Sequence, residues 1–246
     1  PGYTHEYMSS YELKQVYHAI DPIAIAARTR KLDVWNKHMS WSRDNFLKYT
    51  AKRAGVANGW KKWGGEVAGL KADNVISTKE VFERKFQQWA DGTPAGAAYK
   101  ALLPEMRAAS AAASRLIAED QYNKEAALGV ELVQIGASAA RLQRCFQLKI
   151  TEKELDDTLT KVVASLAGFY NNYDSSTDKD VFVSLMSRYG TECANSLPYW
   201  YATQYSAHNQ DINAWATDIY AHSLLASFDK LKAWSKSHSF ADSSLI

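Results

Sequence analysis

The sequence predicts an all-α fold, an irregular bundle of many helices. Only five prolines and twelve glycines occur in 246 residues, so long stretches are free to form helix. Apolar residues recur at steps of three and four, the spacing of one helical face, whereas the alternation of half-buried strands is hardly seen. The chain is 46% hydrophobic and has no Gly/Ser/Pro-rich boundary, so residues 1–246 are expected to bury one core as a single domain.

The first helices are predicted between residues 13 and 39. Four apolar residues share one helical face: Leu13, Val16, Tyr17 and Ile20. The pair Asp21–Pro22 is expected to cap and restart the chain, because proline suits the first turn of a helix. Apolar residues then continue inward along the next helix: Ile25, Leu32, Trp35 and Met39.

Five glycines fall between Ala54 and Leu70. Each should destabilise a helix by about 1 kcal/mol relative to alanine, unless the backbone must approach something closely. One interpretation is tight helix–helix or domain packing through the missing side chains. The other is a ligand-facing surface on which Asn58 supplies a carbonyl acceptor and amide donors. Physical reasoning alone favours packing.

A further helix is predicted after a capping box formed by Ser77 and Glu80. Its apolar residues are Phe82, Phe86 and Trp89. The pair Asp91–Gly92 should end this helix, because glycine tolerates a left-handed C-cap.

The clearest apolar stripes belong to the next two helices, which are expected to pack antiparallel. The first stripe consists of Leu128, Leu132, Ile135, Ala139, Leu142 and Phe146. The second consists of Leu155, Leu159, Val162, Leu166, Phe169 and Tyr173. Thr151 and Glu154 form a capping box at the start of the second helix.

The last clear helix is predicted from about Thr177 to Gly190, and residues 195–198 are typical of a turn. Its apolar side carries Phe182, Leu185 and Tyr189. Cys145 and Cys193 lie on different predicted helices. They either pair in an oxidising compartment or stay buried as thiols, and we favour burial because free cysteine is commonly interior.

Sequence signatures of catalysis are missing. The G-x-S-x-G pattern of a nucleophile elbow does not occur, and Ser138, in a weakly similar stretch, falls inside a predicted helix where such a turn cannot form. The six histidines are scattered without H-E-x-x-H, and no C-x-x-C occurs, so no metal site is predicted. No G-x-x-x-x-G-K-[ST] phosphate loop is present, and no cofactor is expected.

Positive charge is concentrated between Arg28 and Lys62, where ten Lys and Arg stand against Asp33 and Asp44. This basic segment, with several tryptophans nearby, could bind nucleic acid or an acidic protein. A solvated face over a tryptophan-rich core is the simpler interpretation, because the formal net charge is only +2. No apolar run is long enough to cross a bilayer.

One motif is distinctive in its order and spacing. It consists of Tyr49, Ala54, Gly55, Asn58, Trp60, Lys61, Gly65, Gly69 and Leu70. This motif resembles the helical domain of the bacterial dipeptidyl-peptidase 7 and 11 family. Supporting similarities extend the resemblance over essentially the whole chain: Pro1–Thr4, Arg28, Leu32–Trp35, His38–Met39, Phe86–Ala90, Asp178–Phe182 and Asp211–Trp215.

The resemblance implies an all-helical cap inserted into the double-barrel catalytic domain of a secreted or periplasmic serine dipeptidyl-peptidase. Residues 1–12 would lead in from the barrel, and residues 237–246 would return to it. The triad lies in the barrel, so no catalytic residue is expected here. The implied partners are the amino terminus of a peptide substrate and the barrel of the same chain, and a homodimeric parent is left open.

The same resemblance assigns Asn58 to the free amino group of the substrate, where it would fix the dipeptide register. An amide carbonyl accepts from an ammonium without burying another charge. Trp60 and Lys61 match the motif and would support Asn58, with Trp60 packing rather than touching ligand. The family commonly carries an aromatic residue in place of Gly59. The rival hypotheses are a basic binding module and a structural spacer whose glycines serve packing only.

Overall fold

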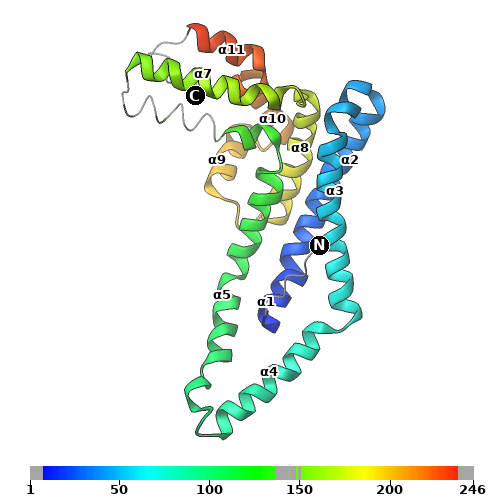
Figure 1. The fold of residues 1–246 in the computed structure, drawn as a ribbon, viewed down its shortest axis with the longest axis vertical. Coiled ribbons are helices and arrows are strands. Elements are labelled where there is room, and N and C mark those ends of the chain that lie inside the picture. Colours follow the sequence, from blue (N-terminus) through cyan, green and yellow to red (C-terminus); the bar gives the residue numbers. More distant parts are fainter. Residues whose placement is uncertain (1–7, 137–143, 145–147, 149–150, 238–246) are drawn as a thin grey trace. The chain divides into compact units, whose positions relative to one another are not determined.

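The computed structural model describes residues 8–136, 144, 148 and 151–237. All regular elements in these ranges are helices, and no strand occurs among them, which confirms the predicted fold class (Figure 1).

The chain divides into two compact units, and the long helices α2 (Asp21–Trp41) and α3 (Arg43–Ala72) contribute to both. The first unit consists of Pro1–Arg28 and Asn58–Asn123, and the second unit of Thr29–Ala57 and Lys124–Ile246. The single domain expected for residues 1–246 stays a prediction.

The first unit begins with α1 (Ser10–Gln15), so the range expected as a linker already contains helix. Ser9 caps it, and the Glu12 carboxylate accepts the Ser9 N–H at 2.8 Å. A π-helical turn, η1 (Val16–Ile20), then runs directly into α2. Proline therefore lies in the first turn of α2 as predicted, but the chain does not restart there, because the wide turn before Pro22 continues the helix.

Helix α1 packs against α4 (Val75–Gly92) and α5 (Leu102–Tyr122). The carboxamide of Gln15 ties it to α5 by donating to Ser114 Oγ at 2.6 Å. A short 3-10 turn, η2 (Ala97–Tyr99), lies between α4 and α5 (Figure 1).

Two local predictions for α4 are wrong. The helix starts after Asn74, which has φ 48°, so Ser77 already lies inside the first turn and does not cap it. Glu80 instead forms an ion pair with Lys14 at 2.6 Å. Gly92 is the last helical residue, but no glycine among the described residues has positive φ, so the left-handed cap is absent. The apolar side of α4 stays partly open to solvent, with Phe82 57% exposed.

The second unit contains the C-terminal part of α2, the N-terminal part of α3, a helical segment over 131–136, and a series of later helices. A π-helical turn, η3 (Asn123–Ala127), precedes the segment at 131–136. The later elements are α7 (Glu152–Tyr170), α8 (Ser175–Glu192), α9 (Tyr199–Ala207), α10 (Ile212–His222), η4 (Leu224–Ala226) and α11 (Phe228–Ser237). Helix α8 packs against α10, and α7 packs against α11.

A buried carboxylate lies at the centre of the second unit. Asp178 on α8 is 1% exposed and accepts hydrogen bonds from the N–H groups of Glu131 and Leu132 at 2.8 and 2.9 Å. The Tyr220 hydroxyl donates to it at 2.7 Å. Asp178 thus satisfies backbone donors at the start of the helical segment 131–136 from another helix. Burial raises the pKa of Asp178 to about 6, although these donors favour its charged form.

The predicted stripes are confirmed where the structure describes them. The Thr151 capping box is present, and α7 buries Leu155, Leu159, Val162 and Leu166. On α8 the buried residues include Phe182, Leu185 and Tyr189. Leu128 and Tyr173 are exceptions. Leu128 lies in a turn before the helix and is 50% exposed, and Tyr173 is buried but follows the end of α7. Outside the described residues lie Ser138, Ala139, Leu142, Cys145 and Phe146.

Cys193 is buried at the end of α8. Cys145, with which it was proposed to pair, lies outside the described residues. Within those residues, no helix combines the length and the apolar character that crossing a membrane requires.

Candidate functional site

The glycine-rich segment forms part of one uninterrupted helix, α3. Around Gly55, Gly64, Gly65 and Gly69, no atom of a neighbour lies within 4 Å of the position that a Cβ would occupy. Packing against the described residues of this chain therefore does not explain these four glycines, and packing against another domain stays a prediction. They leave the backbone of α3 without neighbouring side chains at several points along the helix.

Asn58 and Lys61 are both exposed on α3. They are three residues apart, so they share a face, whereas Trp60 points away from it. Trp60 is 38% exposed, more than expected for a packing residue. The structure thus brings Asn58 and Lys61 together and separates Trp60 from them. No hydrogen bond joins the Asn58 carboxamide to another residue of the described chain.

Gly59 is the one glycine of this segment with a close neighbour. A Cβ at this position would overlap Nη1 of Arg28, which reaches over from α2. The Arg28 guanidinium carbon lies 4.2 Å from the centre of the Trp63 ring, a cation–π contact. The missing side chain of Gly59 therefore makes room for the guanidinium beside Asn58. Sequence reasoning missed this role of Arg28, because it depends on contact between two helices.

Asp21 lies on α2 and is 1% exposed. Its Oδ2 atom is buried and accepts no hydrogen bond from the described residues. Burial raises the pKa of this carboxyl to about 6, and the charge of Glu66 adds to the shift while that of Lys62 opposes it. The glycine-rich part of α3 thus contributes charged groups to the surroundings of a buried acid.

The basic residues between Arg28 and Lys62 do not form one open cationic face, because several are engaged inside their own unit. Lys31 is buried and donates to the Gly129 carbonyl at 2.5 Å. Further contacts join Lys52 to Glu131, Lys48 to Asp44, and Arg53 to Asn36. This arrangement fits the simpler interpretation of the charge better than a nucleic-acid site.

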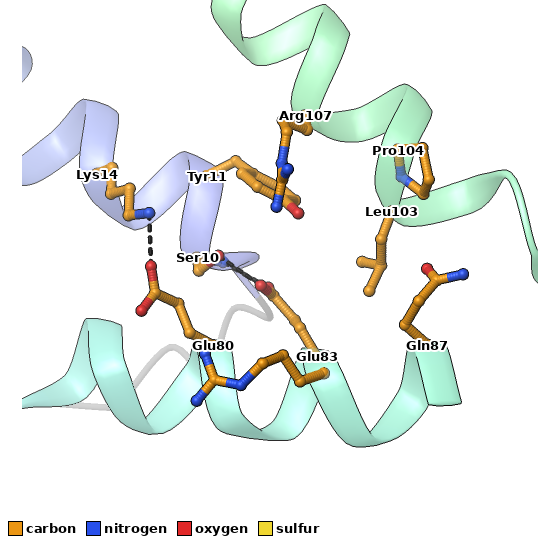
Figure 2. A pocket seen from close by; sticks show the side chains of 10 residues that line it. Ser10, Tyr11, Lys14, Glu80, Glu83, Gln87, Leu103, Pro104 and Arg107 are labelled. Atoms are coloured by element: carbon orange, nitrogen blue, oxygen red, sulfur yellow. Dashed lines mark hydrogen bonds and ion pairs between the residues drawn. The ribbon is translucent and has the colours of Figure 1, made fainter. Parts of the chain in front are cut away.

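A pocket of about 720 Å³ lies in the first unit between α1, α4 and α5 (Figure 2). Its volume is in the range of small-ligand sites, roughly 300–1,000 Å³. The lining combines charged, aromatic and apolar residues: Ser10, Tyr11, Lys14, Glu80, Glu83, Arg84, Gln87, Leu103, Pro104 and Arg107. No sequence motif marked this pocket, because its residues come from three separate segments.

In the described part of the chain, no group of three or more His, Cys, Asp or Glu side chains is arranged to hold a metal ion. Histidines instead contact carboxylates at the surface. His38 Nε2 lies 2.8 Å from Asp180 Oδ2, and Asp218 contacts both His208 and His222 at 3.2 and 2.9 Å.

The family model and the similar curated proteins point to the same class of peptidases. The model of the family named Peptidase S46 matches residues 1–244. The chain is 31% identical over 237 residues to an Asp/Glu-specific dipeptidyl-peptidase of Flavobacterium psychrophilum, covering 95% of this chain and 32% of that protein. It is 22% identical over 224 residues to dipeptidyl-peptidase 7 of Capnocytophaga gingivalis, covering 91% of this chain and 31% of that protein.

The fold is also similar to solved structures. The crystal structure of Porphyromonas endodontalis DPP11 in complex with the dipeptide Arg-Glu superimposes with a TM-score of 0.81 at 19% identity. The match covers 99% of this chain and 35% of that one. The chain therefore spans about a third of the length of the relatives that it matches.

Proposed function

Because the chain belongs to the peptidase S46 family, we propose that it is the helical cap of a serine dipeptidyl-peptidase that releases dipeptides from free amino termini. In this proposal Asn58 binds the substrate amine, and the triad lies outside the chain. The observation that carries the proposal is the exposed Asn58 carboxamide, held on a continuous helix.

The chemistry of Asn58 suits an ammonium ligand. Its carbonyl oxygen can accept one ammonium hydrogen, and a hydrogen bond to a charged group is worth about 1.5–3 kcal/mol. Lys61 on the same face opposes the ammonium, and while the site is open to water two charges about 6 Å apart interact by less than about 1 kcal/mol. The rigid helix positions the acceptor at little entropic cost.

A cap that closes over a bound peptide would exclude water and admit only two residues beyond the amine contact. The names of the relatives support a dipeptidyl-peptidase, and the P. endodontalis structure contains a dipeptide. We extend the proposal to a periplasmic or secreted location for the full-length protein. Cell fractionation with an antibody against this chain tests that part separately.

The test compares dipeptide release by the full-length protein and its Asn58→Ala variant. Each is assayed on peptides with a free or an acetylated amino terminus, with an acidic or an apolar second residue. Asn58→Ala is expected to lower kcat/KM on free-amine peptides about tenfold to a hundredfold, because 1.4 kcal/mol corresponds to a factor of ten. The residual activity on acetylated peptides should not change.

Asn213→Ala provides a matched control, because Asn213 is an exposed asparagine on another helix, α10. It should behave as wild type on every substrate. Equal kinetics of Asn58→Ala and wild type would instead favour the structural-spacer hypothesis. Absence of dipeptide release from any peptide would reject the proposed activity itself.

A further inference from the structure

The pocket between α1, α4 and α5 contains two acids that already have partners on α1. Glu80 forms an ion pair with Lys14 at 2.6 Å. Glu83 is 5% exposed and accepts the Ser10 N–H at 2.6 Å as well as the Ser10 hydroxyl. Figure 2 shows both pairs between α1 and α4. Both carboxylates therefore already accept hydrogen bonds from α1.

Two arginines of the pocket have no such partner. Among the described residues, no hydrogen bond or ion pair engages Arg84 of α4 or Arg107 of α5. Arg107 extends from α5 beside Tyr11, with its guanidinium carbon 5.8 Å from the ring centre (Figure 2). Guanidinium groups with unused donors bind carboxylates in a bidentate fashion.

The electrostatic field of the pocket favours negative charge. The hydrogen bond from Lys14, followed by the charges of Arg84 and Arg107, holds the pKa of the Glu80 carboxyl below its usual value. The lining carries three cations and two carboxylates, so an additional anion would complete the balance.

The remaining wall provides a hydrogen-bond acceptor and apolar surface. Gln87 donates through Nε2 to Asp91 and to the Lys100 carbonyl at 3.1 and 3.0 Å, which fixes the orientation of its amide. Its Oε1 atom is buried and has no donor among the residues that the structure describes, and Figure 2 shows this oxygen on the side of Leu103. A ligand N–H directed at Oε1 would remove the cost of an unsatisfied buried acceptor.

We propose that this pocket binds a short peptide bearing a carboxylate, with Arg84 and Arg107 holding the carboxylate and Gln87 facing a peptide N–H. The apolar part of the peptide would lie against Leu103 and Pro104. The pocket volume exceeds what a simple inorganic anion requires, and the mixed wall suits an amphipathic ligand. Asn58 takes no part in this site.

The test is calorimetric titration of the full-length protein with three probes. N-acetyl-Ala-Glu-amide offers only a side-chain carboxylate, N-acetyl-Ala-Ala offers only a terminal carboxylate, and N-acetyl-Ala-Gln-amide is the neutral control. At least one acidic probe should bind at least tenfold more tightly than the neutral probe. The acidic probe that binds more tightly shows whether the pocket prefers a side-chain or a terminal carboxylate. All three probes lack the free amine, so Asn58→Ala should bind them as wild type does.

The double variant Arg84→Gln/Arg107→Gln should weaken acidic-probe binding at least tenfold. Both side chains are exposed, so the thermal midpoint should stay close to that of wild type. Lys85→Gln is the matched control, because Lys85 is exposed on the same helix but does not line the pocket. No saturable binding of either acidic probe, or equal binding by the double variant, would overturn the proposal even if Asn58 proves to bind the amine.

Discussion

Asp178 in the second unit and Asn58 in the first are polar residues on long helices, yet their surroundings differ in every respect. Asp178 is 1% exposed and accepts hydrogen bonds from two backbone N–H groups and a tyrosine hydroxyl. Asn58 is exposed, and no residue of the described chain bonds to its side chain. A buried group with satisfied partners stabilises a fold, whereas an exposed group with unused capacity is available for a ligand.

The largest expected effect on this comparison comes from removing the Asp178 carboxylate. Asp178→Ala leaves the N–H groups of Glu131 and Leu132 and the Tyr220 hydroxyl buried without an acceptor, which should cost about 3–5 kcal/mol of unfolding free energy. Thermal unfolding of the full-length protein measures it as a lowered midpoint. Asn58→Ala, in contrast, should change the unfolding free energy by less than about 0.5 kcal/mol.

A similar loss of stability in both variants would remove the distinction between a structural and a ligand-binding polar group. Asp178→Asn refines the test, because an amide retains one acceptor oxygen for the donors around it. Its loss of stability should lie between those of wild type and Asp178→Ala.

Asp21 sharpens the comparison, since it is buried like Asp178 but its Oδ2 atom has no donor among the described residues. Burial raises its pKa from 3.8 to about 6, so between these values the folded protein retains a proton that the unfolded chain has released. The free energy of unfolding therefore falls as pH rises through this range. Above pH 6 the full cost of burying the charged Asp21 carboxylate is present. Asp21→Asn should remove the cost and raise the unfolding free energy at pH 7 by about 1 kcal/mol.

The measurement is the difference in thermal midpoint between Asp21→Asn and wild type from pH 3.5 to pH 7. This difference should be near zero at the acid end and should grow through the range of the raised pKa. Asp33→Asn, an exposed change on the same helix, is the matched control and should show no such growth. A constant difference for Asp21→Asn would mean that its carboxyl is not buried in the folded protein.

Local signals predicted the fold well wherever no distant residue competes with them. The Thr151 capping box and the stripe of α7 depend on residues within a few turns, and both are confirmed. The capping box predicted at Ser77 is absent because α4 already begins at Val75, and Glu80 pairs with Lys14, 66 positions earlier in the chain. Leu128 fits the period of its stripe but lies in a turn outside the helix.

In the candidate site, too, some features could be predicted from the sequence and others depend on contacts between helices. The role of Asn58 came from the motif in which it lies, and its exposure on α3 is compatible with that role. Arg28 beside Gly59 and the pocket around Arg107 depend on contacts between helices, which periodicity does not encode. The glycines of α3 were visible in the sequence, but only the structure shows that no described side chain packs at Gly55, Gly64, Gly65 or Gly69.

The smallest expected effects compare two glycines of α3. Gly64 has open space at its Cβ position, so Gly64→Ala should stabilise the helix by about 0.5–1 kcal/mol. Gly59→Ala gains the same helix propensity but displaces the Arg28 guanidinium from Trp63, which costs about 0.5–1 kcal/mol. The two terms should nearly cancel, and thermal unfolding of both variants under the same conditions tests this.

An Arg28→Ala background separates the two contributions at Gly59. Once the guanidinium is absent, Gly59→Ala has nothing to displace, so it should stabilise the protein as much as Gly64→Ala does. If Gly59→Ala already stabilises the protein that much with Arg28 in place, the guanidinium does not depend on the space at Gly59. The neighbourhood of Asn58 would then be as open as that of Gly64, and the contrast with the closed surroundings of Asp178 would be complete.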